Sequence, residues 1–245
     1  MLRQRPDAMK IKVSELIVNY MQRLGIEYVF GMPGAHILPV YDSLYDAPIR
    51  SVLVKHEQGA AFMAGGYARA SGRIAACITT AGPGATNLVT GIANAYADRQ
   101  PLLIVTGETS THIFGKGGLQ ESSGEGGSID QAALFKSITG YNKIVERTDY
   151  LGQVLRQATA VLHSSSPAPV LLSLPFNVQS ELVDDAILQE IRSKPRRPRL
   201  HHGSPQIEAA CRAIAAARRP VIIAGHGCLR ARAQELVERL SSSLN

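Results

Sequence analysis

One carboxylate in the sequence stands where an acid can do chemistry rather than only face water. Glu57 lies in the stretch KHEQGAAFMAGGYARASG (residues 55–72), between a strand-like run and a helix made almost entirely of small residues. An acid in the first turn of a helix can simply complement the helix dipole. The small residues, however, let another body approach closely, and an apolar shell raises the pKa of a carboxyl by desolvation. A carboxyl of that kind can share a proton with a basic ring nitrogen of a ligand.

A glycine-rich turn, AGPGATN, is the second candidate for chemistry. Gly82 and Gly84 follow a strand-like run and open a helix, as in a dinucleotide-binding fingerprint. Glu108 ends the next strand, near the spacing of a ribose-binding acid. Pro83 lies inside the turn and Asn87 replaces the third glycine, and both oppose that interpretation. The alternative is a structural tight turn in which glycine supplies unusual dihedral angles.

The elements that must position these residues alternate regularly between two kinds of pattern. Near-continuous apolar runs predict strands at residues 27–30, 51–56, 74–80, 102–107 and 169–175. Helical periodicity predicts helices at residues 13–24, 36–46, 57–71, 85–98, 150–163 and 204–217. The alternation predicts an α/β fold, a three-layer doubly wound parallel sheet with helices on both faces.

Unusual residues gather where the predicted strands end. GMPG (31–34), His56-Glu57, AGPGATN (81–87) and GET (107–109) each follow a strand. Ligands of open parallel sheets bind beyond the carboxyl ends of the strands, so we expect a site where these segments meet. The polar stretch 108–128 is long enough to indicate a functional or mobile loop.

Composition excludes several classes of protein. The chain of 245 residues is 45% hydrophobic and 19% charged, as in ordinary globular domains. It has no apolar run of about 18 residues, so no membrane span is expected. The N-terminus lacks the apolar core of a secretory signal. Cys77, Cys211 and Cys228 are too few for a disulfide framework or zinc site, and we expect small buried side chains in a reducing cytoplasm.

The net charge of +6 does not indicate a nucleic-acid partner. Much of the excess lies in KPRRPR (194–199), a proline-punctuated run that predicts a solvated linker. A nucleic-acid surface needs interleaved aromatic residues, and these make up only 5% of the chain, with no tryptophan.

The chain is predicted to contain two units. A first domain covers residues 1–182, a linker 183–203, and the opening of a second α/β domain 204–245. In the last of these, RRPVIIAGHG predicts a strand running into a glycine turn, followed by a helix at RAQELVERL. No neighbouring strand follows, so we expect an incomplete domain.

Three stretches, taken together and in order, resemble the thiamine-diphosphate enzymes of the acetolactate synthase type. They are VFGMPGAHILPVYDSL, KHEQGAAFMAGGYARASG and TTAGPGATNLVTGIANAYADRQPLLIVTGE. The resemblance covers the pyrimidine-binding domain to about residue 180, through LQE (119–121) and PAPVLLSLPFNVQ, and continues into RRPVIIAGHG of the central domain.

The resemblance implies a set of site residues and a reaction. Glu57 would be the catalytic acid that shares a proton with ring nitrogen N1′ of the cofactor's aminopyrimidine. The implied cofactor-binding residues are Pro33, Gly34, Glu57, Pro83, Gly84 and Asn87, and the implied substrate residue is Gln120. The implied reaction decarboxylates pyruvate or another 2-keto acid and transfers the two-carbon unit to a second 2-keto acid. In this family one cofactor is held between two chains, so the resemblance implies a homo-oligomer or a complementary chain as partner.

The sequence also departs from the family. The family holds Mg²⁺ through a Gly-Asp-Gly motif and a downstream asparagine, and no Gly-Asp-Gly occurs here, so the Mg²⁺ ligands would lie outside this chain. On its own the chain is therefore expected to be inactive. SSSPAP (164–169) replaces an arginine-glycine element tied to FAD, and Ser173 replaces an acid, which argues against FAD.

Two alternatives to an acetolactate-synthase-like carboligase stay open. The first is a relative of other specificity, such as a 2-keto acid decarboxylase, because GGSIDQAALFK (126–136) makes the loop longer than in acetolactate synthases. The second is a non-catalytic fragment that associates with a full-length subunit.

Overall fold

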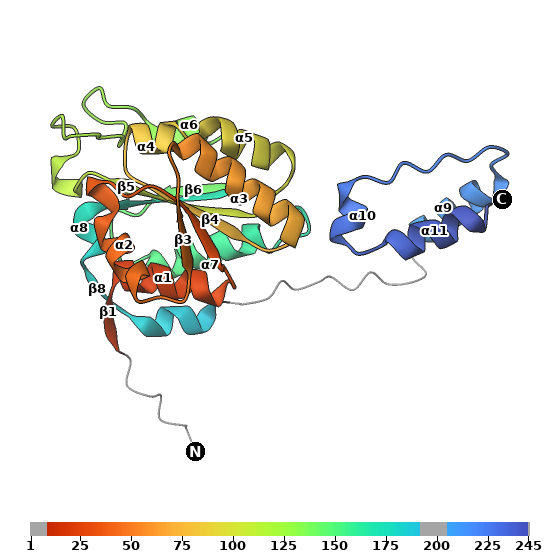
Figure 1. Ribbon diagram of the computed structural model, residues 1–245, viewed down its shortest axis with the longest axis horizontal. Coiled ribbons are helices and arrows are strands. Elements are labelled where there is room, and N and C mark those ends of the chain that lie inside the picture. Colours follow the sequence, from red (N-terminus) through yellow and green to blue (C-terminus); the bar gives the residue numbers. More distant parts are fainter. Residues whose placement is uncertain (1–8, 192–204, 245) are drawn as a thin grey trace, which may run out of the picture. The chain divides into compact units, whose positions relative to one another are not determined.

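Six parallel strands form the centre of the first unit, which spans Met1–Arg196 in a computed structural model of the protein (Figure 1). The structure describes residues 9–191 and 205–244. The strands are β2 (Tyr28–Gly31), β3 (Arg50–Leu53), β4 (Ala75–Thr79), β5 (Leu102–Glu108), β6 (Tyr141–Ile144) and β7 (Val170–Pro175). Their order across the sheet is β3-β2-β4-β5-β7-β6, and every pairing is parallel. The carboxyl ends of all six therefore meet at one edge.

Helices cover both faces of this sheet (Figure 1). One face carries α1 (Val13–Arg23), α2 (Leu38–Tyr45), α7 (Leu151–Leu162) and α8 (Phe176–Gln179). The other carries α3 (Glu57–Ser71), α4 (Pro83–Thr86), α5 (Val89–Ala97) and α6 (Gln131–Phe135). Short 3₁₀ helices lie at Ala35–Ile37, Thr111–Ile113 and Asp185–Glu190.

Side chains alternate between the two cores along each central strand. In β4, Ala76 and Ile78 join the core under α1, α2 and α7, whereas Ala75 and Cys77 join the core under α3 and α5. All four are completely buried, which explains why the strands read as near-continuous apolar runs. Burial also raises the pKa of the Cys77 thiol to about 12. The three-layer parallel sheet is confirmed.

Small residues bring α3 and α5 close together. A Cβ atom added at Gly91 of α5 would lie 2.4 Å from the Cβ of Ala61 in α3. On its outward side α3 is open, because a Cβ at Gly59 or Gly66 would meet no atom within 4 Å. The helix ends at Gly72, whose φ of +70° is a left-handed conformation suited to glycine.

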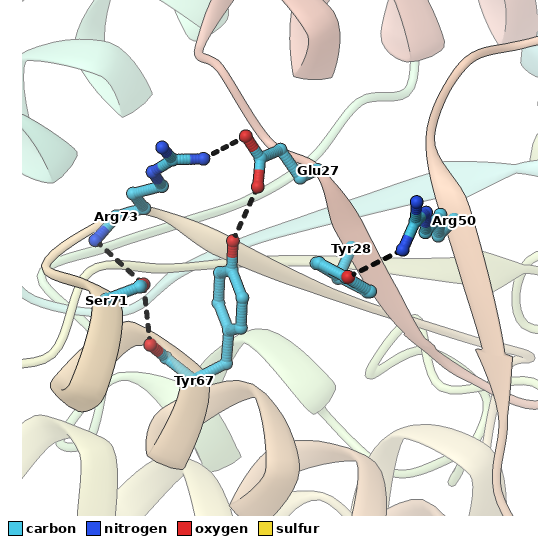
Figure 2. Close-up of polar contacts among 6 residues, drawn as sticks. All are labelled: Glu27, Tyr28, Arg50, Tyr67, Ser71 and Arg73. Carbon is cyan, nitrogen blue, oxygen red and sulfur yellow. Dashed lines mark hydrogen bonds and ion pairs between the residues drawn. The ribbon is translucent and has the colours of Figure 1, made fainter.

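A polar and aromatic cluster fastens the far end of α3 at the amino-terminal edge of the sheet (Figure 2). The Tyr67 hydroxyl donates to Glu27 at 3.0 Å, and Arg73 forms an ion pair with the same carboxylate. The rings of Tyr67 and Tyr28 lie 5.1 Å apart, and Arg50 donates to the Tyr28 hydroxyl at 3.1 Å. Burial, followed by the Glu27 carboxylate, raises the pKa of Tyr67. The cluster joins helix α3 to the starts of β2, β3 and β4.

Three strands were not predicted, and the pairing of two of them corrects the first domain boundary. β6 is one, and β1 (Lys10–Lys12) pairs antiparallel with β8 (Leu182–Asp184). Part of the predicted linker, residues 183–191, therefore belongs to the first unit, where Val183 and Ile191 are buried. The remainder of the predicted linker, residues 192–203, lies outside the described residues. Such short strands are defined by distant partners rather than by an apolar run.

The second unit, Arg197–Asn245, contains α9 (Pro205–Ala216), α10 (His226–Arg230) and α11 (Gln234–Ser242) in its described part. The strand predicted at RRPVIIAGHG is wrong: Val221 is 84% and Ile223 93% exposed, without strand pairing. A strand needs a neighbour for its backbone N–H and C=O groups, and the described residues of this unit supply none. Cys211 is likewise exposed, contrary to prediction. No helix in the described ranges is long and apolar enough to cross a membrane.

Candidate active site

Glu57 is the first residue of α3 and lies, partly exposed, just beyond the carboxyl end of β3. His56 caps this helix, because its Nδ1 accepts a hydrogen bond from the backbone N–H of Gln58 at 3.2 Å. The Nδ2 of Asn87 donates to Oε2 of Glu57 at 3.0 Å. Within the part of the chain that the structure describes, Oε1 of Glu57 has no hydrogen-bond partner. The pair therefore leaves one acceptor oxygen for a ligand.

Thr80, at the end of β4, lies between the two predicted cofactor loops. A Cβ at Gly34 would lie 2.6 Å from the Thr80 Cβ, and one at Gly84 would lie 2.7 Å from its Cγ2. Only glycine therefore allows both loops to approach Thr80 this closely. The turn itself opens with Gly82 at a φ of +55°. The unusual dihedral angle expected of a tight turn is therefore present at Gly82.

Gln120 reaches the same place from the loop after β5. Its Oε1 accepts a hydrogen bond from the Thr80 hydroxyl at 3.3 Å and also lies 3.3 Å from Nδ1 of His36. Its backbone has a φ of +58°, and a Cβ at Gly82 would lie 3.0 Å from its own Cβ. His36 and Thr80 were not predicted as site residues, although both lie within the motifs that carry the resemblance.

The two acids near Gln120 serve the loop rather than a ligand. Glu108 is fully buried, and its carboxylate accepts from the backbone N–H groups of Thr109 at 2.8 Å and Ser122 at 3.1 Å, and from the Ser122 hydroxyl. A carboxylate engaged in this way is not presented to a ribose, which contradicts the dinucleotide interpretation. Glu121 accepts from the backbone N–H groups of Gly115 at 2.6 Å and Gly118 at 3.0 Å. The first of these, with the Ser123 hydroxyl, lowers the pKa of Glu121.

The predicted site residues thus fall into two adjoining groups. Glu57 and Asn87 form one, and Gly34, Gly84 and Gln120 gather around Thr80 as the other. Pro83 opens α4 and so joins the two groups along the chain, since Asn87 donates its backbone N–H to the Pro83 carbonyl at 3.0 Å. Pro33 is exposed between β2 and the first 3₁₀ helix.

This edge of the sheet fits the pyrimidine end of thiamine diphosphate. The unpaired Oε1 of Glu57 can accept a hydrogen bond from a protonated ring nitrogen. The glycine loops leave room for a flat ring to approach the backbone. Among the described residues, no group of three or more His, Cys, Asp or Glu side chains is suited to a metal ion.

Comparison with known proteins agrees with this geometry. Residues 11–133 match the family described as thiamine pyrophosphate enzyme, N-terminal TPP binding domain. A probable acetolactate synthase large subunit of Methanocaldococcus jannaschii is 38% identical over 234 residues, which are 94% of this chain and 38% of that protein. A probable 2-ketoarginine decarboxylase of Pseudomonas aeruginosa is 37% identical over 241 residues, covering 96% of this chain and 41% of that protein.

A solved structure has the same fold. It is a thiamine diphosphate-dependent 4-hydroxybenzoylformate decarboxylase of Rhodococcus jostii RHA1, with a TM-score of 0.84 over 96% of this chain and 43% of that chain, at 21% sequence identity. The present chain spans about two fifths of the length of these relatives. It belongs to the thiamine pyrophosphate enzymes and carries their N-terminal TPP binding domain.

Proposed function

We propose that this chain supplies the pyrimidine half of the thiamine diphosphate site in an acetolactate-synthase-like carboligase. The enzyme would decarboxylate pyruvate and transfer the two-carbon unit to a second 2-keto acid. The observation that carries the proposal is the Glu57–Asn87 pair, which leaves one carboxylate oxygen unpaired at the edge of the sheet where ligands bind. The similarity to acetolactate synthase large subunits supports the choice of reaction.

The role of each residue follows from its contacts. Oε1 of Glu57 would hold a proton on N1′ of the aminopyrimidine, while Asn87 keeps Oε2 in place. Thiamine diphosphate, when bound, would supply the carbon that attacks the keto group and would store the electron pair that the broken C–C bond leaves behind when CO₂ departs. Gly34 and Gly84 would line the ring, and Gln120 would contact the substrate.

A second polypeptide is part of the proposal. Phe62 and Met63 on the outward side of α3 are 44% and 50% exposed, next to glycines whose missing Cβ atoms leave open space. Such a face suits close packing against another body, which would also close an apolar shell over the partly exposed Glu57. We propose that this body is a second copy of the protein, or a complementary chain that carries the diphosphate-binding and Mg²⁺-binding residues.

A 2-keto acid decarboxylase is the second candidate. The similarity to a probable 2-ketoarginine decarboxylase, at 37% identity against 38% for an acetolactate synthase large subunit, favours it. The two reactions part after CO₂ leaves, since the carboligase adds a second keto acid and the decarboxylase adds a proton. Product analysis with pyruvate as sole substrate distinguishes acetolactate from acetaldehyde.

The test of the shared chemistry is the variant Glu57→Gln in the assembled enzyme, meaning this chain with the polypeptide that completes its site. An amide cannot share the N1′ proton, so hydrogen–deuterium exchange at the reactive carbon of bound cofactor should slow by about 100-fold or more. The shape is nearly unchanged, so the far-UV circular dichroism spectrum should be that of the parent. Exchange at the parent rate would remove Glu57 from the mechanism.

A further inference from the structure

We propose that His36 and Thr80 hold the side-chain amide of Gln120 in one orientation, with its carbonyl oxygen turned to them and its NH₂ group left to donate to a ligand. The inference deepens the proposed function and rests on it in one respect, the assignment of Gln120 as a substrate contact. His36 and Thr80 would then be positioning residues that act through Gln120.

The hydrogen-bond count at Gln120 supports this orientation. An amide oxygen has two acceptor positions, and here both are filled, by the Thr80 hydroxyl and by Nδ1 of His36, each at 3.3 Å. The two donors of Nε2 have no partner in residues 9–191 or 205–244, and the residue is partly exposed. The hydrogen-bonding groups of this side chain that lack a partner are therefore its two N–H donors.

The two orienting residues also hold each other. The backbone N–H of His36 donates to Oγ1 of Thr80 at 3.3 Å, which leaves the single hydroxyl hydrogen of Thr80 for Gln120. The carbonyl of His36 accepts from the fully buried Gln179 at 2.6 Å, so its backbone is fixed from a third element, α8.

The backbone of Gln120 is equally constrained. Its φ of +58° is a left-handed conformation that residues with a Cβ rarely adopt. The next two residues are both anchored, Glu121 on the turn at residues 115–118 and Ser122 on the buried Glu108. Gly82 packs against Gln120 from the other side. The direction of the side chain is therefore set by the fold.

The orientation selects a class of ligand atom. An outward NH₂ group donates to a carboxylate or keto oxygen, both of which a 2-keto acid carries. The reversed amide would present its carbonyl oxygen, and two acceptor oxygens cannot form a hydrogen bond, so binding of a carboxylate or keto oxygen there would be disfavoured. The two orientations require different forms of His36: the proposed one needs a proton on Nδ1, and the reversed one needs Nδ1 bare and the proton on Nε2.

The imidazole tautomer therefore decides between them, and it can be measured on this chain without cofactor. Two-bond ¹H–¹⁵N spectra of the ¹⁵N-histidine-labelled chain, recorded above the titration range of imidazole, report the protonated nitrogen directly. His56 is a control in the same sample, because its Nδ1 accepts from Gln58 and requires the Nε2–H form. His36→Gln and His56→Asn assign the signals. We expect Nδ1–H at His36, and Nε2–H there would overturn the proposal.

Two variants of Gln120 sharpen the result. In Gln120→Glu the carboxylate still accepts, so His36 should keep its Nδ1–H form. In Gln120→Leu the acceptor is gone, so His36 should shift mainly to Nε2–H, the form that free imidazole prefers. Retention of pure Nδ1–H in the leucine variant would also overturn the proposal. Since the readout needs no cofactor, failure of Glu57 to act on thiamine diphosphate would end the proposed function and leave this result intact.

Discussion

At the scale of single residues, the site depends on which oxygen and nitrogen atoms are already paired. Asn87 occupies one carboxylate oxygen of Glu57 and leaves the other. Gln120 has its oxygen paired and its nitrogen unpaired within the described ranges. The chemistry that a ligand meets is set as much by these neighbours as by the two residues themselves.

Asn87→Ala should weaken the Glu57 arrangement without removing the acid. Loss of one hydrogen bond to a charged group costs about 1.5–3 kcal/mol, so exchange at the reactive carbon of bound cofactor should slow by about 10- to 100-fold in the assembled enzyme. Asn94→Ala is the matched control, because Asn94 is exposed on α5. Equal rates in the two variants would show that Asn87 does not support Glu57.

The Glu121 carboxylate makes the 115–123 loop sensitive to acid. Hydrogen bonds from Gly115 and Ser123 lower its pKa in the folded chain, below the value of about 4.3 for an unfolded glutamate. The contribution of the carboxylate to the stability of the folded loop is therefore fully present above the unfolded pKa, and it is lost as the pH falls through the lower pKa of the folded chain.

The measurement is amide hydrogen exchange at Gly115 and Gly118. At neutral pH, Glu121→Gln should exchange faster than the parent at both amides, because an amide oxygen is a weaker acceptor than a carboxylate. The difference should shrink at acid pH, once the parent carboxylate is protonated. A difference that does not change with pH would contradict this role of the charge.

At the scale of elements, the close contact between α3 and α5 limits which residues α5 can accept at that contact. Gly91→Ala would bring a Cβ to 2.4 Å from Ala61 and should reduce the free energy of unfolding by about 1–3 kcal/mol. Gly66→Ala is the matched control on the open side of α3, where alanine meets no atom within 4 Å and should raise helix stability by up to about 1 kcal/mol. Urea unfolding measures both, and destabilisation by Gly66→Ala would mean that this face is not open.

The central elements could be predicted from the sequence because each carries its own signal. The five apolar runs became β2, β3, β4, β5 and β7, and α3 has the predicted bounds of residues 57–71. β6, β1 and β8 could not be predicted, since most of their side chains are exposed or only partly buried and their pairing depends on distant segments. The VIIAG run led to a wrong strand prediction for the opposite reason. Its apolar pattern is strong, but the described residues of the second unit contain no strand with which it could pair.

The same distinction applies to the candidate site. The motifs could indicate Glu57, Asn87 and the glycines, because local turn chemistry and resemblance both identify them. The meeting of His36, Thr80 and Gln120 could not be predicted from spacing, because these residues are separated by 40 or more positions and are joined by tertiary structure alone.

At the scale of the whole molecule, the proposed site is half of a larger one. A polypeptide of these 245 residues should bind thiamine diphosphate with Mg²⁺ only weakly, with a dissociation constant of about 1 mM or above. The diphosphate carries most of the cofactor's charge, and this sequence lacks the Gly-Asp-Gly motif through which the family holds Mg²⁺. Isothermal titration decides the question. Micromolar binding together with consumption of pyruvate would mean that a diphosphate site exists in this chain.

Helix α3 runs from one edge of the sheet to the other, and each of its ends makes side-chain contacts with other elements. Glu57 and the His56 cap stand at one end, and Tyr67 lies near the other in the cluster with Glu27 and Arg73 (Figure 2). The helix has 15 residues and is about 22 Å long at a rise of 1.5 Å per residue. The contacts of Tyr67 and Arg73 with Glu27 hold its carboxyl end, and the Asn87–Glu57 hydrogen bond holds its amino end, so a rigid-body shift of the helix would break contacts at one end or the other. We therefore expect Glu57 to move toward a ligand mainly by rotation of its own side-chain bonds.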